Sequence, residues 1–176
     1  DRVGMLLVTD RLEKVVPPRK GRRHVLRLVR EVIGYMPEGT GTNLSLGLDH
    51  LRYVLPHRSV VFLVSDLLTD GYESSLAMVA RRHDLIVISV EDAVERELPN
   101  AGLVQLVDGE TGETTIIDSS SREVRAWYER RVRLQRERRH QILRRHEVDQ
   151  IELQTDQPYE RELIRFFKQR ARRLAR

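Results

Sequence analysis

The sequence predicts an α/β protein with a mostly parallel, doubly wound sheet. Two short, wholly apolar runs, "RSVVFLVSD" at 58–66 and "DLIVISVED" at 84–92, have the length and composition of parallel strands covered by helices on both faces. A helical pattern at 72–82 separates them, which gives a β-α-β order with a right-handed crossover as the default connection. We therefore expect both runs to be buried, with the strand at 58–66 central in the sheet.

The N-terminal third predicts a hairpin followed by two helices that face the core. "VGMLLVTD" at 3–10 and "LEKVVPP" at 12–18 indicate adjacent strands joined by a tight turn. Apolar residues then recur at helical spacing on either side of the glycine-bracketed "EGTGTN" at 38–43. These residues are Val25, Leu28, Val29 and Val32 in the first helix, and Leu44, Leu48, Leu51 and Leu55 in the second.

The C-terminal half predicts a second hairpin, a long helix, a last strand and an amphipathic helix. Two alternating runs about a Gly- and Asp-rich turn at 102–118 indicate a hairpin near the sheet edge. "SSRE" at 120–123 has capping-box spacing for a helix to about 146, and 148–156 has the pattern of a strand. In the helix expected at 159–175, one face carries Tyr159, Leu163, Phe167 and Leu174.

Length and composition bound the class of protein. With 176 residues and 40% hydrophobic content, the chain suits one domain over residues 1–176. Its apolar runs are shorter than the roughly 18–20 residues that a membrane span needs. The absence of cysteine excludes disulfides, cysteine-ligated zinc and thiol catalysis, and fits a reducing compartment such as the cytoplasm.

Two oxygen-bearing residues fall where open α/β sheets place their working crevice, beyond the carboxyl ends of the strands. Asp66 ends the apolar strand at 58–66, and Thr42 lies in the loop that opens the next helix. A carboxylate and a hydroxyl that converge there can hold Mg²⁺, which prefers oxygen ligands. Each residue can equally serve as a local cap. Asp70, in "LTDG" at 68–71, is the weaker candidate because Asp66 directly terminates the strand.

Other site chemistries lack their motifs. "GTGTN" has no Lys-Ser/Thr of a phosphate-binding loop, and no G-x-G-x-x-G follows a strand. The six histidines form no H-E-x-x-H motif, and no serine lies in a G-x-S-x-G elbow. A Mg²⁺-dependent hydrolase built on Asp66 would lack a second acid or base. The sequence therefore favours a binding module that is not an enzyme.

An arginine-rich helix supports an alternative function, nucleic-acid binding. The chain has 28 arginines and three lysines, and residues 121–146 contain ten Arg against three Glu. Against this, 27 acidic residues are interspersed along the chain and the net charge is only +4. No apolar residue occurs from Gln135 to Gln141, and this gap in the apolar pattern predicts that the middle of the helix packs less tightly than its ends.

Several separated blocks together resemble a known family. "DRVGMLLVTDRLEKVVPPRKGRRHVLRLVREV", "PEGTGTNLSLGLDHL" and "RSVVFLVSDLL" are similar to the bacterial domain-of-unknown-function family 58, as are the segments through the closing "RELIRFFKQRARR". The resemblance implies a fold similar to the von Willebrand factor A domain. In that fold a metal-ion-dependent adhesion site takes ligands from an Asp-x-Ser-x-Ser loop, a Thr and an Asp. Thr42 matches the second ligand and Asp66 the third.

The resemblance also implies partners and a missing part. It implies a partnership with MoxR-type AAA+ ATPases, which help to assemble or mature other proteins. It also implies membrane segments upstream, which many family members carry. No Asp-x-Ser-x-Ser occurs in these 176 residues. We therefore expect an N-terminally truncated domain without its first strand, which binds Mg²⁺ weakly or not at all by itself. That strand would lie between the strands at 3–10 and 58–66, so we also expect self-association near those two strands.

Overall fold

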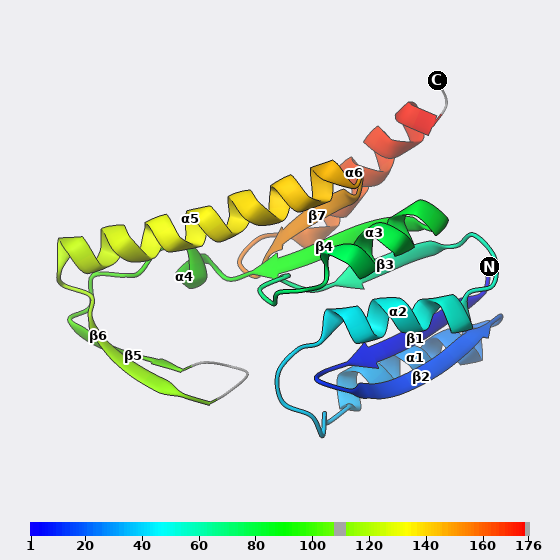
Figure 1. Cartoon of the computed structure of the whole chain (residues 1–176), viewed down its shortest axis with the longest axis horizontal. Helices are drawn as coiled ribbons and strands as arrows, with labels where there is room; N and C mark the ends of the chain where they lie inside the picture. Colours follow the sequence, from blue (N-terminus) through cyan, green and yellow to red (C-terminus); the bar gives the residue numbers. More distant parts are fainter. Residues whose placement is uncertain (108–111, 175–176) are drawn as a thin grey trace. The chain divides into compact units, whose positions relative to one another are not determined.

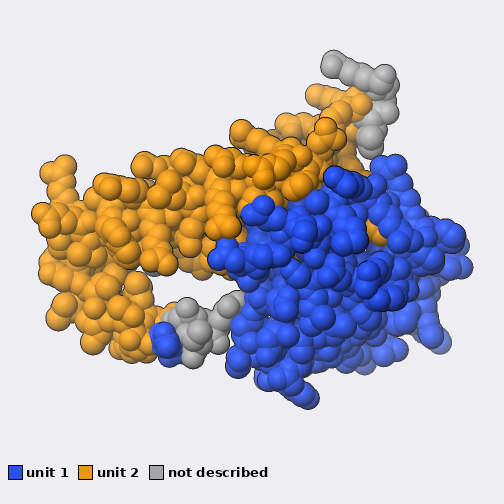
Figure 2. Space-filling view, in the orientation of Figure 1, with its two compact units in different colours: residues 1–59, 69–82, 108–113 blue, residues 60–68, 83–107, 114–176 orange. Residues whose placement is uncertain are grey.

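The computed structural model describes residues 1–107 and 112–174. The chain divides into two compact units, shown in different colours in Figure 2. Unit 1 contains Asp1–Ser59 and Thr69–Arg82, and unit 2 contains Val60–Leu68, His83–Val107 and the chain from Thr114 onward. The single domain over residues 1–176 stays a prediction.

Unit 1 is a hairpin with helices packed on it (Figure 1). Strands β1 (Val3–Val8) and β2 (Leu12–Arg19) pair antiparallel, which confirms the first predicted hairpin. Helices α1 (Arg22–Gly34) and α2 (Leu44–Val54) confirm the two helical patterns that follow it, and α3 (Glu73–Arg82) confirms the pattern at 72–82 and packs against α2.

Close contacts fix both N-terminal helices to the hairpin. A Cβ atom added at Gly47 of α2 would lie 2.7 Å from Cγ2 of Val8, so the missing side chain lets α2 approach β1 closely. On α1, Glu31 forms an ion pair with Lys14 of β2. The predicted core positions Leu44 and Leu48 of α2 are buried by this packing.

The expectation that α1 faces the core along its whole apolar stripe is wrong. Of the four predicted residues only Leu28 is buried, whereas Val25, Val29 and Val32 are each more than 40% exposed. A two-stranded hairpin offers too little surface to cover a helix of 13 residues, so part of the stripe stays open to solvent.

Unit 2 is built on a parallel sheet of three strands in the order β3-β4-β7. These are β3 (Val60–Val64), β4 (Asp84–Glu91) and β7 (Asp149–Gln154), and both pairings are parallel. Two long helices, α5 (Arg122–Arg145) and α6 (Tyr159–Leu174), pack on β7. The chain is therefore a mixed α/β protein with a parallel sheet, as the sequence predicts.

The central strand of this sheet is β4 and not β3. In β4 the side chains of Ile86 and Val87 are almost completely buried, while Val60 and Val64 of β3 are exposed. Strand β3 is an edge strand, with β4 as its neighbour. On one face of β3 the edge-to-face contact of Phe62 with Phe167 of α6 gives only partial cover. The predicted burial of 58–66 on both faces is therefore wrong. An apolar run alone does not distinguish an edge strand from a central one.

Helices α5 and α6 lie on opposite faces of the parallel sheet. Residues paired in register on parallel strands point to the same face, and Ser89 of β4 is paired with Glu152 of β7. Glu152 contacts α5. Asp149, three residues before Glu152 and paired with Ile86, points to the other face and forms an ion pair with Arg170 of α6. The two helices thus enclose β7 from both sides.

A short helix and a second hairpin complete unit 2. Helix α4 (Ala93–Arg96) follows β4, and strands β5 (Leu103–Val107) and β6 (Thr114–Asp118) pair antiparallel as predicted, although they form a separate two-stranded sheet and are not added to the parallel one. The turn of this hairpin includes residues outside the described ranges.

The ends of the two long helices differ in detail from the sequence patterns. Ser121, and not Ser120, caps α5 by accepting a hydrogen bond from the Val124 amide at 3.4 Å, while Ser120 bonds to Asp118. On the predicted apolar face of α6, Leu163 is half-buried and Tyr159 is exposed. The side chain of Leu174 lies outside the described residues.

The strands β1 and β3 each have a single neighbour in their own sheets. In unit 1, β1 pairs with β2, and in unit 2, β3 pairs with β4. Sheet edges of this kind carry main-chain groups that another strand can pair with. Self-association near these two strands stays a prediction.

Candidate site at the carboxyl end of the parallel sheet

Asp66 lies on a tightly constrained loop where β3 ends. The Ser65 amide still donates to the Ile88 carbonyl of β4 at 3.1 Å, which continues the ladder to the residue before Asp66. Oδ1 of Asp66 then accepts from the Leu68 amide, and Oγ of Ser65 accepts from the Leu67 amide, both at 3.1 Å. Leu67 is buried with a φ of +58°, a conformation that non-glycine residues rarely adopt. The Asp66 side chain is exposed.

Arg139 of α5 forms a hydrogen bond with the backbone of this loop. Its Nη1 donates to the backbone carbonyl of Asp66 at 3.0 Å, and its Nη2 donates to Glu91 at the end of β4. Glu152 of β7 lies 3.5 Å from the same Nη2. Arg139 is 4% exposed, so one buried guanidinium connects the loop after β3 with β4 and β7.

Further arginines surround Glu91, which is 7% exposed. Arg96 lies 3.1 Å and Arg136 3.6 Å from its carboxylate. Burial alone would raise the pKa of Glu91, but the hydrogen bond and charge of Arg139 lower it. The charges of Arg136 and Arg96 lower it further, and the pKa of Glu91 lies below its ordinary value of 4.5.

Glu152 is the second carboxylate of this ion-pair network. His140 bonds it at 2.7 Å and Arg136 at 3.1 Å, both from α5. Burial would raise the pKa of Glu152, but the hydrogen bond with His140 and the charges of Arg136, His140 and Arg139 hold it below the ordinary value. Both carboxylates are therefore ionised at neutral pH.

These lowered pKa values predict that acid destabilises the protein. Because Glu91 and Glu152 in the unfolded chain titrate near 4.5, the unfolded state takes up protons first as the pH falls. Their contribution is complete above pH 4.5 and is lost as the pH drops through their lower folded pKa values. The urea concentration at the unfolding midpoint should therefore decrease as the pH is lowered from about 5 to about 3. In Glu91→Gln this decrease should be less steep. A midpoint that stays constant or rises on acidification would contradict this.

The same network corrects the expected loose packing in the middle of the arginine-rich helix. The gap from Gln135 to Gln141 contains Arg139, one of three buried residues of α5 together with Ile142 and Leu143. Charged side chains fill the gap because they meet Glu91 and Glu152 on the sheet. Apolar periodicity does not detect this kind of packing.

Thr42 lies in unit 1, in the loop before α2. The cap of α2 is its neighbour Asn43, whose side chain accepts from the Leu46 amide at 3.1 Å. The Asn43 amide donates to the Thr9 carbonyl at 2.8 Å, and the Thr42 carbonyl accepts from the Thr69 hydroxyl at 3.1 Å. The residue that caps α2 is therefore Asn43 and not Thr42. The hydrogen bond to Thr9 connects the loop to the turn between β1 and β2.

Glu13 of β2 also organises this loop, which the sequence analysis missed. Its carboxylate accepts from the Thr9 hydroxyl and the Gly39 amide at 2.7 Å, and from the Tyr35 hydroxyl at 2.8 Å. These bonds, with a longer one from the Glu38 amide, lower the pKa of Glu13 to about 2. A Cβ at Gly39 would lie 2.2 Å from the Thr9 hydroxyl, so a side chain here would displace the groups that bond to Glu13. The charged residue within a strand and the distant glycine give no joint signal in the sequence.

The two predicted metal ligands thus belong to different units, and their shared site stays a prediction. Within residues 1–107 and 112–174, no group of three or more His, Cys, Asp or Glu side chains is arranged to hold a metal ion. Sequence reasoning identified Asp66 from its place after an apolar strand. It missed Arg139, Glu91 and Glu152, because their ion pairs join distant parts of the chain.

Of the helices in the described part of the chain, none has the length and apolar character needed to cross a membrane.

The fold and the site together define a mixed α/β protein with a parallel sheet and a constrained acidic loop at its carboxyl end. Residues 1–138 match the family described as "Protein of unknown function DUF58", and the chain belongs to this family. An uncharacterized protein of Mycobacterium avium is 30% identical over 164 residues, which are 89% of this chain and 94% of that protein.

Longer mycobacterial proteins are also similar. Uncharacterized proteins of Mycobacterium bovis and Mycobacterium tuberculosis are each 31% identical over 115 residues, which are 64% of this chain. The match spans only 36% of the length of those relatives. No solved structure matches the chain.

Proposed function

We propose that this chain is a non-enzymatic protein-interaction module with a von Willebrand factor A-like fold. The single observation that carries the proposal is the loop at Asp66: an exposed carboxylate at the carboxyl end of a parallel sheet, on a backbone held by Arg139 and by the buried Leu67. Such rigid placement suits a residue that contacts a ligand. The parallel order of β3 and β4 fits the proposed fold.

The group that this module would hold is Mg²⁺, with Asp66 as a ligand and Thr42 as the second ligand expected from the resemblance. Oxygen donors match the chemistry of this cation. When bound, the ion would offer an open position to an acidic group of a partner protein. The part of Arg139 is to neutralise Glu91 and to orient the Asp66 backbone, which leaves the Asp66 carboxylate directed to solvent.

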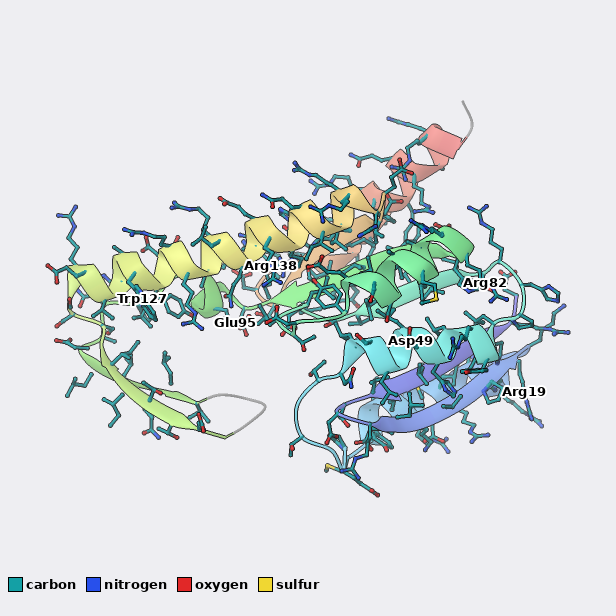
Figure 3. The ribbon with its side chains drawn as sticks, in the orientation of Figure 1. Arg19, Asp49, Arg82, Glu95, Trp127 and Arg138 are labelled. Carbon is teal, nitrogen blue, oxygen red and sulfur yellow. The ribbon has the colours of Figure 1, made fainter. Side chains whose placement is uncertain are left out.

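The partner that we propose is a MoxR-type AAA+ ATPase or its client, with the module acting in assembly or maturation of other proteins in the cytoplasm. The alternative, nucleic-acid binding by α5, has less support. Several arginines of this helix serve the fold: Arg136 and Arg139 pair with glutamates of the sheet, and Arg125 donates to the Ser119 and Ser120 carbonyls. Figure 3 shows the side chains along α5, with Trp127 and Arg138 labelled.

Calorimetric titration with Mg²⁺ tests the metal site. We expect weak or undetectable binding to these 176 residues, because two protein oxygens leave an octahedral ion poorly held. In a form extended by a strand ending in Asp-x-Ser-x-Ser, binding should appear and Asp66→Asn should abolish it, while the matched control Asp70→Asn should retain it. Unchanged affinity in the Asp66 variant would remove this residue from the site, and a Thr42→Val variant tests the second ligand separately.

The partner and the alternative function need their own measurements. A pull-down with a purified MoxR-type ATPase should depend on Mg²⁺ and on Asp66.

Titration with duplex DNA and single-stranded RNA should show no submicromolar affinity at physiological salt. If such affinity appears and is lost when Arg138, Arg144 and Arg145 are changed to Glu, nucleic-acid binding is the better description. Arg139 is left unchanged in that variant because it is buried.

A further inference from the structure

A cavity of about 380 Å³ lies in unit 2 between α5, β7 and α6. Among its lining residues, Leu143 and Ile151 are buried and Phe166 is half-buried, and we call this apolar part of the lining the floor. The volume lies within the range of known ligand sites, about 300–1,000 Å³. Neither Thr42 nor Asp66 lines it, so the cavity is distinct from the metal site proposed above.

The cavity opens on the outer edge of β7. Gln150 and Glu152 point to the face covered by α5, as their side-chain hydrogen bonds to Ser89 and His140 show. Ile151, between them, points to the opposite face. Side chains of both faces can line one cavity only at the edge of a strand, and β7 is an edge strand of its sheet. The main chain of such an edge can pair with an added extended peptide.

The charges around the cavity favour an anion. Glu152 is paired with Arg136, and Glu162 is paired with Arg165. Arg144, in the last turn of α5, lines the cavity and is exposed, and within the described part of the chain it has no carboxylate partner. A guanidinium next to an apolar floor suits a ligand that joins a carboxylate to an apolar group, because its planar donors match a carboxylate.

We propose that this cavity binds the C-terminal end of an extended peptide. The last apolar side chain lies on the floor against Leu143 and Phe166, the terminal carboxylate pairs with Arg144, and the peptide main chain forms hydrogen bonds along the edge of β7. A free acid such as N-acetylphenylalanine shares the carboxylate and the ring, but it has little main chain to pair with a strand. The two sources of the same chemistry can therefore be separated.

Fluorescence anisotropy with the whole chain tests the proposal. The probe is a fluorescein-labelled Ser-Thr-Val-Phe peptide with a free C-terminal carboxylate, compared with the same peptide amidated at its C-terminus. Because a hydrogen bond to a charged group contributes about 1.5–3 kcal/mol, the amide should bind at least about tenfold more weakly. Arg144→Gln should weaken the acid by a similar factor and remove the difference between the two probes.

Arg145→Gln is the matched control, because Arg145 is also exposed at the end of α5 but does not line the cavity. It should bind both probes like the unchanged protein, and circular dichroism should show that both variants fold. The proposal is overturned if the acid probe does not bind, if acid and amide bind equally, or if Arg144→Gln binds like the control. Competition by N-acetylphenylalanine as strong as by the unlabelled peptide would overturn the pairing with β7.

Discussion

Replacing Arg139 by alanine should lower the free energy of unfolding by about 3–5 kcal/mol, the cost of removing one partner of a buried ion pair. The substitution leaves Glu91, which is 7% exposed, without its closest cation, and it removes the hydrogen bond to the Asp66 carbonyl. Urea denaturation followed by circular dichroism measures the change. Hydrogen exchange at the Leu67 and Leu68 amides should also become faster, because Arg139 no longer holds the loop.

Two companion variants show whether the cause is the buried charge. Arg130→Ala removes an exposed arginine from the same helix and should change stability by no more than about 0.5 kcal/mol. The double variant Arg139→Met with Glu91→Gln should be more stable than Arg139→Met alone, because the remaining partner is then neutral. If Arg139→Ala is as stable as Arg130→Ala, the buried ion pairs of Arg139 do not stabilise the fold.

Replacing Ile86 by alanine should cost about 2–5 kcal/mol, the usual range for emptying a well-packed core position. Ile86 is 1% exposed at the centre of the three-stranded sheet, between β3 and β7. The lost contacts and the cavity left behind both destabilise the folded state. The loss should appear as a lower urea midpoint with an unchanged dependence on denaturant concentration.

Val64→Ala is the comparison that decides which strand is central. Val64 is 66% exposed on β3, so its truncation should change stability by no more than about 0.5 kcal/mol. The sequence alone does not predict this difference, because it gives both apolar runs as buried strands and places the strand at 58–66 in the middle of the sheet. A large loss in Val64→Ala with a small one in Ile86→Ala would contradict the central position of β4.

The sequence by itself determined the elements and their order, apart from the short helix α4. Apolar runs of strand length located β3 and β4, helical spacing located α1 and α2, and turn residues located both hairpins. These features are local, because they depend on the period of the side chains along one element. Asp66 was found in the same way, as the polar residue that follows an apolar strand.

Only the tertiary structure decided which elements are neighbours and which charges are buried. Strand β4 is central because it pairs on both sides, and a strand's own residues do not encode how many neighbours it has. The ion pairs of Arg139 join residues 48 and 13 positions apart, so no local pattern marks them. The cavity beside β7 likewise exists only because α5 and α6 cover opposite faces of an edge strand. Local periodicity is set by the chain, whereas neighbours and burial arise when distant segments pack.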